Sequence, residues 1–163
     1  MRTLLLAASV LTLALTTAVP ATVANPDGAT KAALALAPVP PGRLTDAARP
    51  LYYRIDLTVN PDLERFSGKA EIDIVLKRSS TFIDLHGRDL KMASAVAVVG
   101  GKRLPARYYE LDESGVARLV FDSALPAGPV TLQFDYDAPF SNSPAGMFRV
   151  KVGDDWYSWT QFQ

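Results

Sequence analysis

The stretch Phe66-Ser67-Gly68-Lys69-Ala70-Glu71-Ile72-Asp73-Ile74-Val75-Leu76 alternates between apolar and polar residues with a period of two. Successive side chains of a β-strand point to opposite faces of its sheet, so this alternation is typical of a strand with one buried face. The run before it, from Tyr53 to Val59, has the same period, and Asn60-Pro61-Asp62 between them is a turn signal. The sequence therefore predicts two half-buried antiparallel strands joined by a short turn.

Seven further short runs have the composition of strands. They cover residues 81–86, 90–99, 103–111, 117–121, 130–136, 147–152 and 156–162. Gly100-Gly101, between two of these runs, predicts a two-residue hairpin turn. No run indicates a convincing helix, and no repeat has a fixed period. We therefore predict an all-β fold, an antiparallel β-sandwich, for residues 51–163.

The N-terminal residues have the pattern of an export signal. Met1-Arg2 supplies a positive charge, an uncharged run extends from Leu4 to Ala18, and small residues follow up to Ala24. We expect a signal peptide over residues 1–24 with cleavage after Ala24, or alternatively after Ala21. Because the apolar run is shorter than a bilayer span, we expect no stable membrane anchor after cleavage and a periplasmic or secreted protein. Residues 25–50 are rich in Ala and Pro and are interpreted as a linker.

Charge and residue types restrict the chemistry of the chain. Lys+Arg and Asp+Glu both number 17, so the formal net charge is zero and no nucleic-acid partner is expected. The chain has no cysteine, one histidine (His86) and no H-E-x-x-H sequence. Since a catalytic zinc site normally takes three protein ligands, we expect no metal to be bound by this chain. The carboxylate pairs Asp112-Glu113 and Asp154-Asp155 lie in expected turns, so we predict no catalytic residues.

Aromatic residues gather near the C-terminal end of the sequence. Strand alternation puts Trp156 and Ser158 on one face of the last strand and Tyr157 and Trp159 on the other. This pattern suits a strand that is buried on both sides or covered by another domain, but a carbohydrate-stacking surface would have the same composition.

Several segments, taken in order, resemble the beginning of the aminopeptidase N family of zinc metallopeptidases (gluzincins). The segments that carry the resemblance are YRIDL (53–57), FSGKAEI (66–72), IDLH (83–86), LPAG with LQF (125–134), GMFR (146–149) and WTQF (159–162). Each fragment alone is weak, but six in the right order over residues 51–163 make the resemblance specific. It implies that residues 51–163 are part of a saddle-shaped N-terminal β-sandwich domain, incomplete at its C-terminal end.

The resemblance also carries functional expectations. Members of the family remove single residues from peptide N-termini with zinc, whose ligands lie in a later catalytic domain. In their T-Q-F-E segment the Gln lines the pocket for the first substrate side chain, and the Glu helps to bind the free α-amine. Gln161 matches that Gln, whereas Gln163 stands at the position of the Glu. An amide carries no charge, so it should bind an ammonium group less strongly.

The leading hypothesis is thus an N-terminal domain fragment of an exported zinc aminopeptidase, inactive without its catalytic domain. That domain is the expected partner, and peptide N-termini are the expected substrate. The alternative hypothesis is a stand-alone exported β-sandwich that binds a peptide, a protein or a carbohydrate. The apolar strand left at the C-terminal edge of a partial sandwich also predicts poor solubility of the chain expressed by itself.

Overall fold

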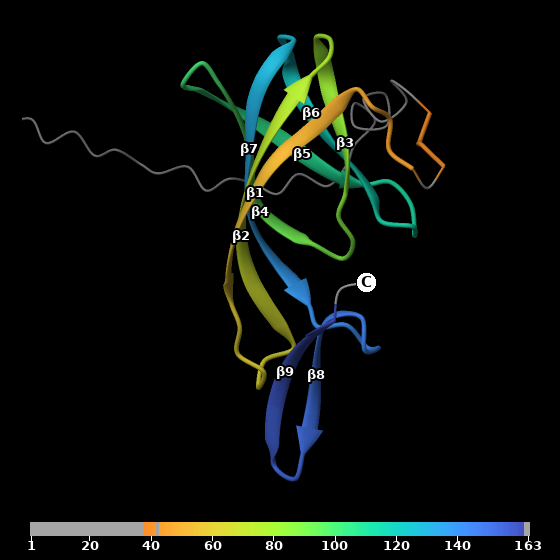
Figure 1. The fold of residues 1–163 in the computed structure, drawn as a ribbon, viewed down its shortest axis with the longest axis vertical. Coiled ribbons are helices and arrows are strands. Elements are labelled where there is room, and N and C mark those ends of the chain that lie inside the picture. The colour runs from red at the N-terminus through yellow and green to blue at the C-terminus, as the bar shows by residue number, and fades with distance from the viewer. Residues whose placement is uncertain (1–37, 42, 162–163) are drawn as a thin grey trace, which may run out of the picture.

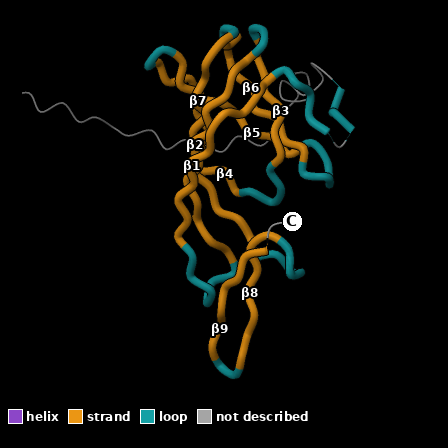
Figure 2. Tube along the Cα trace, viewed as in Figure 1, coloured by secondary structure: helices purple, strands orange, loops and turns teal. Residues whose placement is uncertain are grey.

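A computed structural model describes residues 38–41 and 43–161 of the chain. Nine strands follow one another in these residues: β1 (Ala48–Thr58), β2 (Arg65–Leu76), β3 (Ser80–His86), β4 (Lys91–Val99), β5 (Lys102–Glu110), β6 (Val116–Leu125), β7 (Gly128–Pro139), β8 (Gly146–Val152) and β9 (Asp155–Gln161). The described residues contain no helix (Figure 2), and so none that could cross a bilayer. The predicted all-β class is confirmed, as are the nine predicted strands. The expected signal peptide lies outside the described residues.

Seven of the strands form one curled antiparallel sheet in the order β1-β2-β7-β4-β5-β6-β3. β5 turns the corner of this sheet: its first half pairs with β4 through Leu104 and Pro105, and its second half pairs with β6 from Ala106 onward. The two halves of the curled sheet thereby face each other as in a β-sandwich (Figure 1). The turn between β4 and β5 is the predicted Gly100-Gly101 pair, whose φ values of 55° and 79° are those that a tight hairpin requires.

The core lies between the two halves of the sheet. It is built from apolar residues of β2, β3, β4, β6 and β7, namely Ile74, Leu76, Ile83, Ala95, Ala97, Leu119, Phe121, Leu125, Val130, Leu132 and Phe134. The β2 face predicted from the alternation of residues 66–76 is the one that enters this core, with Ile74 and Leu76 buried at its end. The period of two therefore identified the buried face of β2 correctly.

β1 departs from the expectation of a half-buried strand. Tyr53, Ile55 and Leu57 pair with Ile72, Ala70 and Gly68 of β2, so they lie on the same face of the sheet as the core. Their exposed fractions are nevertheless 54%, 54% and 42%. β1 is an edge strand, and the described residues cover only about half of these side chains.

β8 and β9 form a separate two-stranded hairpin that projects from one end of the curled sheet (Figure 1). The hairpin follows β7 through residues 140–145, and its base lies beside the end of β7. The expected hairpin over residues 147–162 is thus confirmed for the part that the structure describes. The predicted site residue Gln161 lies in it.

Candidate functional site

Gln161 ends β9, at the base of the projecting hairpin. It lies opposite Gly146, the first residue of β8, and its side chain is exposed. Gly146 has no side chain and a φ of +67°, with open space where a Cβ would stand. No cross-strand side chain therefore covers Gln161 on its face of the hairpin. Gln163, the second predicted site residue, lies outside the described residues.

The hairpin has two faces of different character. The register pairs Phe148 with Trp159 and Val150 with Tyr157, and residues directly opposite each other in an antiparallel pair share a face. We call this side the outer face; its members are Phe148, Val150, Val152, Asp155, Tyr157, Trp159 and Gln161. Trp159 is 59% exposed and Tyr157 is 47% exposed. Exposed apolar strips of this kind are typical of interaction surfaces.

The opposite, inner face carries Arg149 and Trp156 and turns toward the rest of the molecule. The Arg149 Nη1 donates to the carbonyl oxygens of Pro61 and Leu63 at 2.9 and 2.7 Å. The guanidinium lies 4.2 Å from the centre of the Trp156 ring. The inner face is thus the attached face of the hairpin, and the outer face with Gln161 is the free one.

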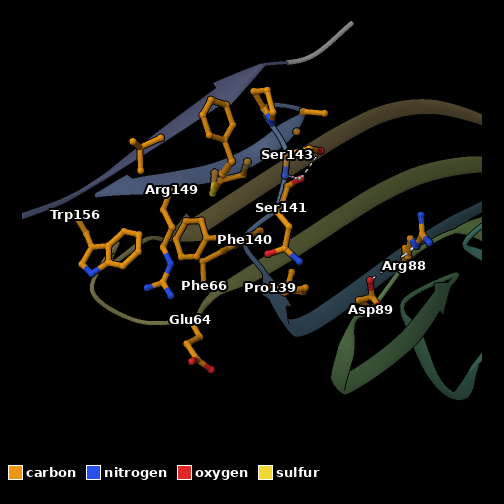
Figure 3. Close-up of a pocket in the computed structure, with 18 residues that line it drawn as sticks. Glu64, Phe66, Arg88, Asp89, Pro139, Phe140, Ser141, Ser143, Arg149 and Trp156 are labelled. Carbon is orange, nitrogen blue, oxygen red and sulfur yellow. Dashed lines mark hydrogen bonds and ion pairs between the residues drawn. The ribbon is translucent and has the colours of Figure 1, made fainter. Parts of the chain in front are cut away.

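An open cleft of 1110 Å³ lies where the hairpin meets the curled sheet (Figure 3). Glu64 comes just before β2 and Phe66 from its start, residues 138–146 supply one wall, and Arg149 and Trp156 come from the hairpin. Phe66 and Phe140 pack edge to face with ring centres 5.4 Å apart. The lining combines aromatic rings with polar side chains, and the carboxylate of Glu64 and the ion pair of Arg88 with Asp89 lie at its margin.

The described residues contain no group of three His, Cys, Asp or Glu side chains that could hold a metal ion. His86 is exposed at the end of β3. The aminopeptidase N family, which the sequence resembles, depends on zinc, but the residues described here do not fit a zinc site.

Asp112 and Glu113 lie in the loop between β5 and β6, as predicted, whereas the second carboxylate pair lies only partly in a turn. The Asp112 Oδ1 accepts hydrogen bonds from the Ser114 hydroxyl at 2.6 Å and from the Ser114 N–H at 3.0 Å. The hydroxyl contact is the main reason why the pKa of Asp112 is lowered. Asp154 lies in the turn between β8 and β9, and Asp155 begins β9. Asp112 thus shows the bonding of a turn-forming aspartate.

Sequence reasoning missed the role of Arg149. Arg149 belongs to the Gly146-Met147-Phe148-Arg149 segment and is one of two basic residues among the C-terminal aromatic residues, but neither observation predicts an anchoring role. The alternation of β8 could have placed its side chain on the face opposite Phe148. The carbonyl groups that it binds are 88 and 86 residues away in the chain, and no sequence pattern points to them.

Comparison with known proteins gives consistent results. Residues 49–163 match the model of the Peptidase M1 N-terminal domain. Two proteins of Encephalitozoon cuniculi (strain GB-M1) are similar over 124 residues: "Probable M1 family aminopeptidase 1" with 31% identity and "Probable M1 family aminopeptidase 2" with 30%. Each alignment covers 74% of this chain and 14% of the relative. The all-β fold and the projecting hairpin described above lie within the matched residues, and the chain belongs to the Peptidase M1 N-terminal domain family.

Proposed function

We propose that residues 49–163 serve as the N-terminal domain of a zinc aminopeptidase that removes single residues from peptide N-termini. In this proposal the zinc site belongs to a catalytic domain, and Gln161 contributes to the pocket for the first substrate side chain. The single observation that carries the proposal is the family match over residues 49–163, in which Gln161 lies uncovered on the outer face of the hairpin.

The outer face of the hairpin is the proposed contact with the catalytic domain. Gln161 shares that face with Tyr157 and Trp159, so a domain that presents a substrate to Gln161 approaches from the same side. Burying apolar surface contributes roughly 25 cal/mol per Å², which makes a large exposed aromatic side chain a strong contributor to domain contact. The aromatic residues would thus hold the catalytic domain, while Gln161 meets the substrate.

The amide of Gln161 suits a side-chain pocket. It can donate and accept hydrogen bonds and carries no charge, so it can face apolar and polar substrate side chains. The opposing Gly146 leaves room for a substrate beside it. We further propose that Gln163 lies near the substrate α-amine and contributes a neutral acceptor there. An amide binds an ammonium group less strongly than a carboxylate, so most of the amine binding would come from the catalytic domain.

Substitution of Gln161 in a complete enzyme tests this proposal. The coding sequence downstream of codon 163 would be read, and the whole polypeptide would be purified with zinc and assayed on alanine anilide. Gln161→Ala should raise KM while kcat changes little, because a pocket contact binds ground state and transition state alike. Ser158→Ala, on the inner face of the same strand, is the control and should leave both constants unchanged.

Two results would count against the proposal. One is a downstream sequence without zinc-ligand residues, together with a polypeptide that has no aminopeptidase activity. The other is turnover of alanine anilide by the purified 163-residue chain with zinc, which would place the catalytic site in this chain.

We also propose that the protein is exported to the periplasm or secreted. The uncharged run from Leu4 to Ala18 and the small residues after it support this proposal. N-terminal sequencing of the protein recovered from the host should begin at Asn25, or at Thr22 if cleavage follows Ala21. Recovery of the mature protein with Met1 in place would exclude cleavage.

A second candidate function is carbohydrate binding by the outer face. The exposure of Tyr157 and Trp159 on that face favours it, because aromatic faces stack on sugar rings. A glycan array would test it: binding that Trp159→Ala abolishes supports a carbohydrate module, and no binding to any glycan removes this candidate.

A further inference from the structure

We propose that Arg149 is a positioning residue, which fixes the β8–β9 hairpin against the β1–β2 turn and so sets the place of Gln161. The anchoring itself follows from contacts in this structure. Its consequence for catalysis rests on the proposed function, in which Gln161 contacts the substrate.

The first contact is with the backbone of the turn between β1 and β2. One nitrogen of Arg149, Nη1, donates to both the Pro61 and the Leu63 carbonyl oxygens. The turn is held in shape by Asn60, whose side-chain oxygen accepts from the Asp62 N–H at 3.0 Å and whose carbonyl accepts from the Leu63 N–H at 3.1 Å. These hydrogen bonds within the turn hold the two carbonyl groups in place independently of Arg149. Hydrogen bonds from a charged donor contribute more than neutral ones.

The second contact is a stack of rings around the guanidinium. Arg149 lies 4.2 Å from the Trp156 ring centre and 5.8 Å from the Phe140 ring centre. Phe140 is buried and packs in turn on Phe66 of β2 (Figure 3). A planar guanidinium can stack on aromatic rings while its edge donates hydrogen bonds, which an ammonium group cannot do equally well. Arg149 thus connects β9, the segment after β7 and the β1–β2 turn.

The other attachments of the hairpin lie at its base. The Ser141 N–H donates to the Met147 carbonyl at 2.7 Å, and Ser141 forms a single bridge with Phe148. The hydrogen bonds of Arg149 attach the hairpin at a point farther from its base than the contacts of Ser141 do, among the described residues. A two-stranded hairpin is marginally stable alone, so we expect it to change its angle to the sheet when this contact is lost. Gln161 is hydrogen-bonded into the hairpin and would move with it.

The anchoring can be tested in this chain without any enzymatic activity. The chain has two tryptophans, so Trp159→Phe leaves Trp156, beside Arg149, as the only tryptophan whose emission is followed. In that background Arg149→Met should shift the Trp156 emission and speed hydrogen exchange of the amides in residues 146–161, with β6 unchanged. Lys151→Met is the matched control, because the Lys151 Nζ also lies over the Trp156 ring, at 5.8 Å. It should leave the exchange unchanged, and Arg149→Lys should restore part of the protection.

The positioning role needs a second measurement, in the complete polypeptide with zinc. Arg149→Met should lower kcat/KM by about 10- to 100-fold, since a displacement on the order of 1 Å at a contact residue can have that effect. The loss should appear in KM and should be non-additive with Gln161→Ala, because both changes remove the same contact. Lys151→Met should leave the kinetic constants unchanged.

The possible results separate the two proposals. Unchanged exchange of the hairpin in Arg149→Met overturns the anchoring. Faster exchange with additive kinetic losses overturns the positioning role of Arg149. Faster exchange in a complete polypeptide that has no peptidase activity supports the anchoring and overturns the proposed function.

Discussion

Arg118 and Asp84 form a two-point ion pair inside the sheet. The Arg118 Nε donates to the Asp84 Oδ1 at 2.6 Å, and Nη2 donates to Oδ2 at 3.0 Å. The side chain of Arg118 is 0% exposed and that of Asp84 is 7% exposed. The guanidinium also lies 4.4 Å from the centre of the Phe82 ring. The pair joins β6 to β3, which is the last strand of the curled sheet.

The first prediction concerns removal of the carboxylate from this pair. Asp84→Ala takes the counter-charge away from a guanidinium that has no access to water, and it should destabilise the fold by about 3–5 kcal/mol. Arg118→Met keeps apolar bulk and should cost less, because it removes the more deeply buried charge. Urea unfolding of both variants measures the difference. Equal or reversed losses would show that the pair does not behave as a buried charge pair.

The second prediction concerns Gly68 of β2, which lies against the Tyr136 ring of β7. A Cβ at this position would lie 2.6 Å from the Cζ of Tyr136 and 2.9 Å from the Cδ2 of Leu57. Gly68→Ala should therefore destabilise the fold by about 1–3 kcal/mol, because the ring has to move. The double variant with Tyr136→Leu should lose less unfolding free energy than the sum of the losses of the two single variants. Strict additivity in thermal unfolding would mean that the ring is not the obstacle.

The third prediction concerns stability at high pH. Burial, with a smaller contribution from Glu110, raises the pKa of Tyr108 to about 12, and its hydroxyl donates to the Gly87 carbonyl at 2.8 Å. Between pH 10 and 12 the unfolded chain loses this proton and the folded chain keeps it. The contribution of Tyr108 is thus complete below pH 10, and the free energy of unfolding falls as the pH rises through this window.

Tyr108→Phe is the corresponding variant. It should lose about 1 kcal/mol at neutral pH with the hydrogen bond, and should show a shallower decline above pH 10. Burial also raises the pKa of Tyr136, so some decline should persist. Urea titrations at pH 8 to 11.5 measure both effects. An unchanged slope in the variant would contradict the assignment to Tyr108.

The fourth prediction concerns the half-exposed apolar face of β1. Tyr53, Ile55 and Leu57 are exposed on an edge strand, an arrangement that favours pairing with another chain. The 163-residue chain should therefore self-associate at micromolar concentration, and Ile55→Lys should reduce the association. Thr58→Lys, on the opposite face of the same strand, is the control for added charge. Sedimentation velocity measures the association. A monomeric unsubstituted chain would contradict the prediction.

The strands were predictable from the sequence because each buried face repeats with period two and each turn has its own residues. In β2 the alternation even identified which side chains enter the core. In β1 the same alternation identified the apolar face but could not tell that it stays about half exposed, since exposure depends on which distant segments pack on the strand. The ion pair of Arg118 with Asp84 was also hidden, because the partners are 34 residues apart.

The candidate site was predictable only in part. Gln161 came from a motif match, and the structure adds that it shares a face with Tyr157 and Trp159. The sequence predicted that these residues alternate, but not which face would be free. Which face is exposed depends on Arg149, because its hydrogen bonds to the distant β1–β2 turn attach the opposite face.

The position of β7 in the sheet has a consequence for the order of folding. β7 lies between β2 and β4, and Arg65 at the start of β2 pairs with Pro139 at the end of β7. Until residue 139 has been synthesised, the growing chain holds a β1–β2 hairpin and a four-stranded β3–β6 unit with no strand to join them. Contacts of such long sequence separation form slowly, because the loop must close before the pairing stabilises it. The nascent chain thus exposes the unpaired edges of β2 and β4 until β7 has been synthesised, and we expect a chaperone that binds extended apolar segments to bind there.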